Sequence, residues 1–157
     1  MIREFECSSV VPADLRAVSA LFWDAAAWQR VWSPMDQIQI EYDDGVHQEF
    51  WMTVNRDGLD ERVRTVRFRY EESLIRFFTP NPPPMMRQHA GSWDFAHHPD
   101  GTVVTATRRF AMKDRFDDSS LKRQWNADAF ADSFQSRVDA ILASFSSHFS
   151  DAGGRHD

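Results

Sequence analysis

The sequence predicts one α+β domain in which a curved antiparallel sheet of about seven strands wraps around a long C-terminal helix, with two short helices after the first strand. Two observations lead to this expectation. Apolar residues recur at three- and four-residue spacing between residues 15 and 32 and after residue 113, and at two-residue spacing in residues 2–11 and from residue 38 to residue 112. The chain has 157 residues, enough for one hydrophobic core and too few for two.

The N-terminal part reads as a strand followed by two short helices. Residues 2–11 alternate loosely between apolar and polar side chains, as a strand does. Pro12-Ala13-Asp14 opens a helix whose apolar face is formed by Leu15, Val18, Leu21 and Phe22. A second helical piece over 26–32 ends at Ser33-Pro34, because the residue before a proline disfavours the helical conformation.

The middle of the chain predicts about six consecutive strands. Period-two alternation runs from residue 38 to residue 112 and is interrupted by turn signals at Asp43-Asp44-Gly45, Asn55-Arg56-Asp57-Gly58 and His98-Pro99-Asp100-Gly101. Consecutive strands joined by short turns pair as an antiparallel meander.

The longest helical pattern closes the domain. Asp117-Asp118-Ser119-Ser120 supplies N-cap candidates, and apolar residues then recur every three or four positions from Leu121 to Phe149. One amphipathic helix covers the apolar face of such a sheet but leaves unfilled space near its open end, so we expect a ligand cavity there. The domain spans 1–150, and 151–157 is expected to be a flexible tail.

Composition excludes several classes of function. Eighteen Lys and Arg against 24 Asp and Glu give a net charge of −6, which argues against nucleic-acid binding. The chain lacks an apolar run of about 18 residues, so no membrane span is expected. A single cysteine, Cys7, and an N-terminus without an apolar core are typical of a cytoplasmic protein. One Cys and six scattered His predict no metal site.

Three segments, taken in order, resemble a known family. They are Trp28-Gln29-Arg30-Val31-Trp32, then Pro82-Pro83-Pro84-Met85 followed by Gly91-Ser92-Trp93-Asp94-Phe95, and finally Gly101-Thr102-Val103 through Phe110-Ala111-Met112-Lys113. Over roughly residues 5–145 the chain is similar to the bacterial polyketide aromatase/cyclases of the START and Bet v 1-like (SRPBCC) superfamily. This resemblance implies the helix-grip fold, which agrees with the element order above.

The resemblance also implies an activity. Members of the family catalyse the intramolecular aldol cyclisation and dehydration of a poly-β-ketone in an internal cavity, which is lyase-type chemistry of antibiotic biosynthesis without a cofactor. The expected partners are an aromatic polyketide substrate and an acyl-carrier protein that delivers it, and the chain is expected to be a monomer or a homodimer. The alternative is a non-catalytic carrier that holds a quinone or a lipid in the same cavity.

Arginine is the residue type that this chemistry favours, because its guanidinium is always charged and presents a planar fork of donors to an enolate or alkoxide oxygen. Counting strand positions carries the family's catalytic arginine onto Arg69. The family's cavity tyrosine falls on Met35 and its seventh-strand His or Gln on Arg108, so both positions depart from the family. Parity on the fourth strand leaves two orientations open. Arg67 and Arg69 share one face with Val63 and Thr65, opposite Val66, Phe68 and Tyr70.

Two further candidates follow from strand parity. Arg108 is in phase with the apolar residues of the seventh strand, and an inward Arg108 predicts a carboxylate partner or an anionic ligand. His89 is in phase with Trp93 and Phe95 and is an acid/base candidate. The expected substrate-binding residues, which core packing explains equally well, are Arg67, Met35, Trp32, Trp51, Met52, Trp93, Phe95, Phe130 and Phe134.

Overall fold

The computed structural model describes residues 1–56, 58–115 and 126–154, and the predicted order of strands and helices is confirmed. The elements are β1 (Ile2–Val11), α1 (Leu15–Trp23), the 3-10 turn η1 (Ala25–Ala27), α2 (Trp28–Val31), β2 (Met35–Asp43), β3 (His47–Arg56), β4 (Leu59–Tyr70), β5 (Leu74–Asn81), β6 (Met86–His98), β7 (Gly101–Met112) and α3 (Ala127–Gly154). The expected N-cap candidates at 117–120, and Leu121 after them, lie outside the described residues.

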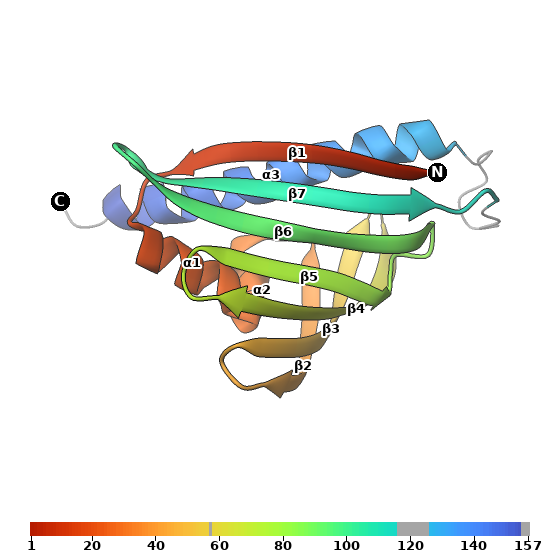
Figure 1. Ribbon diagram of the computed structural model, residues 1–157, viewed down its shortest axis with the longest axis horizontal. Coiled ribbons are helices and arrows are strands. Elements are labelled where there is room, and N and C mark those ends of the chain that lie inside the picture. Colours follow the sequence, from red (N-terminus) through yellow and green to blue (C-terminus); the bar gives the residue numbers. More distant parts are fainter. Residues whose placement is uncertain (57, 116–125, 155–157) are drawn as a thin grey trace.

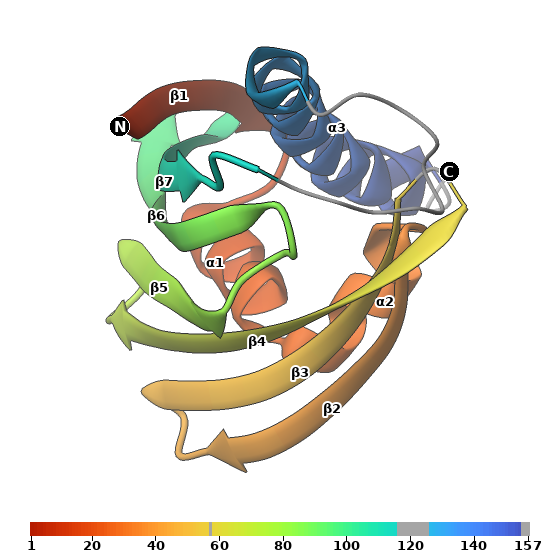
Figure 2. The ribbon, with the colours of Figure 1, turned by 90° about the vertical axis from the view of Figure 1, so that its right-hand side faces the viewer.

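The seven strands form one antiparallel sheet in the order β1-β7-β6-β5-β4-β3-β2. The strands from β2 to β7 follow one another as the predicted meander. The last strand, β7, also pairs with β1 along the whole length of β1. Figure 2 shows the sheet curving round from β1 to β2, with α3 lying along its concave side and α1 and α2 on that same side. The long helix is therefore held by the sheet, and its apolar side faces the interior.

Local signals fix the beginning of the helical segment and the turn that follows β2. Asp14 caps α1, because its side-chain oxygen accepts a hydrogen bond of 2.8 Å from the backbone N–H of Ala17. Gly45 has φ +87 in the turn between β2 and β3, a conformation that favours glycine. No helix among the described residues is both long and apolar enough to cross a membrane.

Aromatic side chains fill the interior next to α1. Phe22 of α1 stacks on Phe145 of α3 with ring centroids 3.8 Å apart, and it also contacts Trp93 and Phe95 of β6. Val138 and Leu142 of α3 are each 1% exposed in the same cluster. Side chains therefore pack closely in the interior beside α1.

Candidate active site

A cavity of about 140 Å³ lies between the concave face of the sheet and α3. Closed apolar cavities of about 150 Å³ accommodate a benzene ring, so this space suits one planar group. Most of the predicted site residues line it: Arg67, Arg108, His89, Met35, Trp32, Met52, Trp93, Phe130 and Phe134. Three predicted site residues do not line it: Arg69, Trp51 and Phe95.

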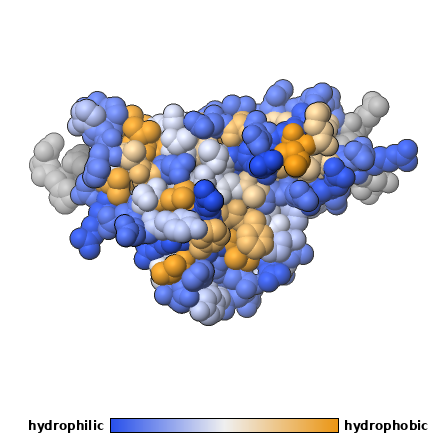
Figure 3. Space-filling model, viewed as in Figure 1, coloured by the Kyte–Doolittle hydropathy of each residue, from blue (hydrophilic) through white to orange (hydrophobic). Residues whose placement is uncertain are grey.

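Strand β4 turns Arg67 and Arg69 towards the inner face of the sheet. Val63, Thr65 and Arg67 are 2%, 4% and 3% exposed, whereas Tyr70 on the other face is 54% exposed. The apolar residues of that other face lie on the convex side of the sheet, where Figure 3 shows apolar groups among polar ones. The inner face is therefore the one that carries Arg67 and Arg69.

Arg67 is the arginine of β4 that reaches the cavity wall, but the protein already uses its donors. Its Nε donates to Oε1 of Gln48 at 2.6 Å, Nη1 donates to the carbonyl oxygen of Phe22 at 2.8 Å, and Nη2 donates to the carbonyl of Trp23. Burial lowers the pKa of Arg67 to about 9, while the negative charges of Asp43 and Asp24 oppose this shift. The guanidinium stays charged at neutral pH and ties β4 to the end of α1.

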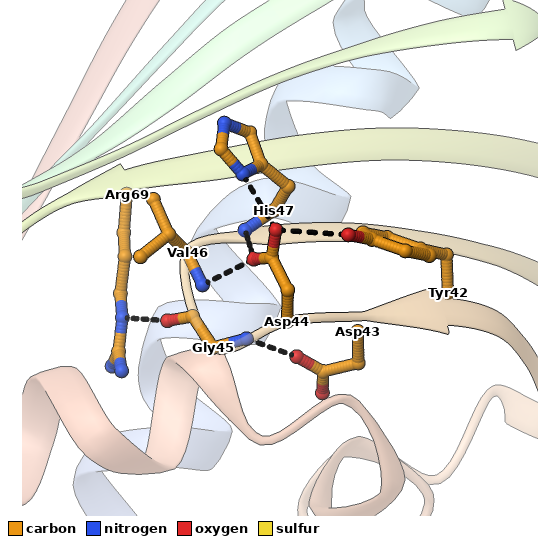
Figure 4. A network of polar contacts seen from close by, with 7 residues as sticks. All are labelled: Tyr42, Asp43, Asp44, Gly45, Val46, His47 and Arg69. Atoms are coloured by element: carbon orange, nitrogen blue, oxygen red, sulfur yellow. Dashed lines mark hydrogen bonds and ion pairs between the residues drawn. The ribbon is translucent and has the colours of Figure 1, made fainter.

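Arg69 lies two positions further along β4, at the turn between β2 and β3, and not at the cavity. Figure 4 shows its Nε donating to the carbonyl oxygen of Gly45, a distance of 2.7 Å. The guanidinium lies over the ring of Trp23, with its central carbon 4.9 Å from the ring centroid. The expectation that Arg69 projects into the cavity is therefore wrong. The inner face of β4 extends beyond the cavity, and Arg69 lies on the part of that face next to the turn between β2 and β3.

Trp51 and Phe95 are also placed differently from the expectation. Trp51 follows Phe50 and precedes Met52, which both line the cavity, so alternation puts its ring on the opposite face of β3. There the guanidinium of Arg62 lies over the ring of Trp51, with its central carbon 4.3 Å from the ring centroid. Phe95 does face inward, but its ring packs on Phe22 with centroids 5.3 Å apart and forms part of the solid core.

Arg108 of β7 is a buried cation whose donors are only partly used. The residue is 4% exposed, and its guanidinium lies 4.8 Å from the ring centroid of Phe77 and 4.4 Å from that of Trp93. Nη1 donates to the carbonyl oxygens of Thr107 at 2.8 Å and Ser92 at 3.4 Å. Among the described residues, nothing accepts a hydrogen bond from Nε or Nη2, and no carboxylate forms an ion pair with Arg108.

His89 of β6 is the second polar residue on this wall. Both of its ring nitrogens are shielded from solvent and have no hydrogen-bond partner among the described residues. The rings of Phe77 and Phe134 meet it edge to face, each with centroids 5.3 Å away. Burial, and then the nearby Arg108 cation, lower the pKa of His89 to about 3, so the imidazole is neutral at physiological pH.

Sequence reasoning missed one charged pair at the cavity. Glu61 of β4 lines it, is 9% exposed and forms an ion pair with Arg56 of β3, whose guanidinium also lies 5.2 Å from the ring centroid of Phe130. Parity with Val63 and Thr65 was the available signal for Glu61. Among the described residues, no group of three or more His, Cys, Asp or Glu side chains is arranged to hold a metal ion.

No protein-family model and no curated protein matches the sequence, whereas many solved structures match the fold. The di-domain ARO/CYC BexL from the BE-7585A biosynthetic pathway has a TM-score of 0.81 at 20% identity, over 94% of this chain and 50% of that chain. The Zhui aromatase/cyclase from Streptomyces sp. R1128 has a TM-score of 0.78 at 15% identity, over 94% and 93% of the two chains. For TTHA0849 from Thermus thermophilus the values are 0.79 and 17%, over 96% and 99%.

The chain adopts the helix-grip fold. BexL aligns with 94% of this chain at a TM-score of 0.81, so the resemblance seen in the sequence is confirmed for the fold. The chain spans half the length of BexL. Identities of 15% and 20% establish the architecture and leave the chemistry of this helix-grip domain to its own residues.

The cavity of this helix-grip domain offers a specific chemical environment. Aromatic and apolar side chains exclude water, a buried guanidinium supplies positive charge with unused donors, and a neutral imidazole supplies one donor and one acceptor. Such a site stabilises negative charge that is delocalised over the oxygens of a planar ligand.

Proposed function

We propose that the protein is a polyketide aromatase/cyclase, which closes a ring in a poly-β-ketone by intramolecular aldol addition and then removes water. The observation that supports this most directly is the buried Arg108, which faces an aromatic-lined cavity with donors that no described residue uses. The similarity in fold to aromatase/cyclase structures agrees with it.

The chemistry needs charge stabilisation and a defined shape. A methylene between two carbonyls loses a proton, its carbon bonds to a distant carbonyl carbon, and the resulting alkoxide takes up a proton before water leaves. In the water-poor cavity, Arg108 stabilises first the enolate and then the alkoxide. Trp93, Phe77 and Phe134 confine the chain so that one pair of carbons meets, which supplies the orientation that a flexible substrate lacks.

The role that the resemblance assigned to Arg69 passes to Arg108 in this proposal. Arg69 lies at the turn after β2, and Arg67, although it lines the cavity, donates to Gln48, Phe22 and Trp23. Arg108 occupies the seventh-strand position where the family has a His or Gln. Its positive charge replaces a neutral donor there, which strengthens the stabilisation of an anionic intermediate.

The direct test supplies the protein with a poly-β-ketone made by a minimal polyketide synthase and identifies the products by mass spectrometry. We expect the wild type to convert the substrate into a cyclised aromatic product. Arg108→Met should lower the rate of its formation by about 100-fold, the usual effect of losing an oxyanion donor.

Arg69→Met is the matched control, because it removes an arginine outside the cavity and should change the rate by less than about threefold. If the wild type leaves the product profile unchanged but still binds the polyketide, the protein is a carrier and the proposal fails. Equal rates for Arg108→Met and the wild type contradict the role of Arg108.

A further inference from the structure

Burying the charge of Arg108 is unfavourable, and no carboxylate among the described residues forms an ion pair with it. Removing a cation from water is unfavourable unless an anion or several hydrogen bonds replace the lost hydration. Two backbone carbonyls accept from Nη1 alone, and the ring faces of Phe77 and Trp93 supply the other contacts. An anion in the cavity would supply the missing partner.

Strand β6 has a glycine next to the side chain of Arg108. Gly91 lies directly opposite Arg108 in the sheet. A Cβ at Gly91 would meet the Thr107 carbonyl oxygen, would lie 2.8 Å from Cζ of Phe77 and would lie 3.1 Å from Cδ of Arg108. Any larger residue at position 91 would collide with these groups, so glycine is what allows the Arg108 side chain to lie against β6 at this point.

His89 lies close to Gly91 and Arg108. It is two residues from Gly91 on the same face of β6, which makes it the diagonal neighbour of Arg108 across the β6–β7 pair. The edge-to-face contacts with Phe77 and Phe134 hold its ring, while both nitrogens lack a partner among the described residues. Burial, and after it the Arg108 cation, lower the pKa of His89, so its imidazole is neutral at physiological pH and offers an N–H donor without a second positive charge.

We propose that Arg108 and His89 form a subsite that binds a planar 1,3-dicarbonyl unit as its enolate. The guanidinium donates to one oxygen of the enolate, and the imidazole N–H donates to the other. The bound unit has lost one C–H proton to the bulk buffer, and its charge is delocalised over both oxygens and the central carbon. This inference rests on the proposed function, since a poly-β-ketone is a series of such units.

The surroundings favour this anion over compact ones. The cavity wall beside Arg108 and His89 consists of aromatic rings, and the volume of about 140 Å³ fits one planar group. A carboxylate or phosphate concentrates its charge on a few oxygens and loses more hydration on entering such a space than a delocalised enolate does. Benzoate is therefore the competing anion against which the subsite is tested.

The probe is 1-phenyl-1,3-butanedione, a planar aryl diketone, titrated into the full-length protein at pH 7. The absorbance band of the enolate measures ionisation of the bound ligand. Calorimetry in two buffers of different ionisation enthalpy measures the number of protons released. We expect the enolate band to appear on binding and close to one proton to be released per ligand bound. Butyrophenone, which has the same ring and one carbonyl, should bind without releasing a proton.

Variants at three positions, with one control, locate the effect. Arg108→Met should reduce affinity at least tenfold and abolish proton release, and Arg108→Lys, which keeps the charge without the fork, should restore part of both. Gly91→Ala keeps the charge but displaces it, because the added Cβ would meet the Thr107 backbone carbonyl, and should weaken enolate formation together with the stability of the fold. His89→Leu should lower affinity, and His89→Gln should restore part of it. Arg69→Met should bind as the wild type does.

The inference fails if the wild type binds the diketone without proton release, if Arg108→Met retains the enolate band, or if benzoate binds more tightly than the diketone. These outcomes are separate from those of the cyclisation assay. Enolate binding without cyclisation would leave the subsite in place and remove the proposed enzyme function. Cyclisation with a neutral bound diketone would leave the enzyme function and remove the subsite.

Discussion

Arg67 and Arg108 have similar burial and different consequences. Both are buried cations with a pKa lowered to about 9. All three nitrogens of the Arg67 guanidinium donate to protein oxygens, so its charge serves the fold. Arg108 uses one nitrogen, and the remaining donors are available to a ligand. At the residue scale, the number of unused donors separates a structural arginine from a candidate catalytic one.

His89 makes a prediction about stability and pH. Its pKa is lowered in the folded protein to about 3 from an ordinary value of 6.5, chiefly by burial. The unfolded chain therefore takes up a proton as the pH falls below about 6.5, whereas the folded protein does not. The stability that neutral His89 provides is fully present above pH 6.5 and is lost as the pH falls towards about 3, at a slope of about 1.4 kcal/mol per pH unit.

Urea unfolding of the wild type and of His89→Gln at a series of pH values between 4 and 7 measures this contribution. The variant has no titrating imidazole at position 89, so its free energy of unfolding should decline less steeply as the pH falls. Parallel declines in the two proteins would mean that His89 is protonated normally in the folded state.

At the scale of elements, strand β4 and helix α1 are joined by a polar network rather than by apolar packing alone. Arg67 donates to the carbonyls of Phe22 and Trp23 at the end of α1, where helical carbonyls lack partners within the helix. Gln48 of β3 accepts from Arg67 and donates to the carbonyl of Trp23 at 3.0 Å and to Oδ2 of Asp43 at 3.0 Å. The network fixes α1 against the sheet.

Replacing Arg67 should therefore cost much more stability than replacing Arg69. Arg67→Met leaves buried acceptors without their charged donor and should lower the free energy of unfolding by at least about 3 kcal/mol. Arg69→Met removes one hydrogen bond from a half-buried position and should cost about 1 kcal/mol. Urea denaturation compares the two, and equal losses would contradict the assignment of Arg67 to the α1 network.

At the scale of the whole molecule, the interior is solid beside α1 and hollow between α3 and the middle strands. Stacked aromatic rings fill the first region, and the cavity of about 140 Å³ occupies the second. A ligand that binds only the folded protein stabilises it by mass action, so its effect on unfolding reports on whether the cavity is accessible.

We expect 1-phenyl-1,3-butanedione at 100 times its dissociation constant to raise the free energy of unfolding by about 2.7 kcal/mol. Val63→Phe should abolish this increase, because Val63 lines the cavity and a phenyl ring there would occupy it. Val66→Phe makes the same change on the convex face of the same strand and should leave the increase intact. Stabilisation that persists in Val63→Phe would place the ligand outside the cavity.

The sequence by itself determined the element order, the antiparallel meander and the position of the long helix, because spacing, turn residues and proline act locally. Strand parity put Arg108 and His89 in phase with apolar residues and left their orientation open, and the structure places both at the cavity. Neighbouring Trp51 and Met52 could not both face inward, and the same alternation identifies Trp51 as the outer one.

Only the tertiary structure decided which face of β4 is inside. Both faces of that strand carry apolar residues, and the inward arginines are explained by the end of α1 and the turn after β2, whose carbonyls accept their hydrogen bonds. Those acceptors are far from β4 in the sequence, so no local pattern contains them. Arg67 and Arg69 differ for the same reason. Strand parity puts both side chains on the inner face, and the packing of the other elements determines that Arg67 contacts the end of α1 and Arg69 contacts the turn after β2.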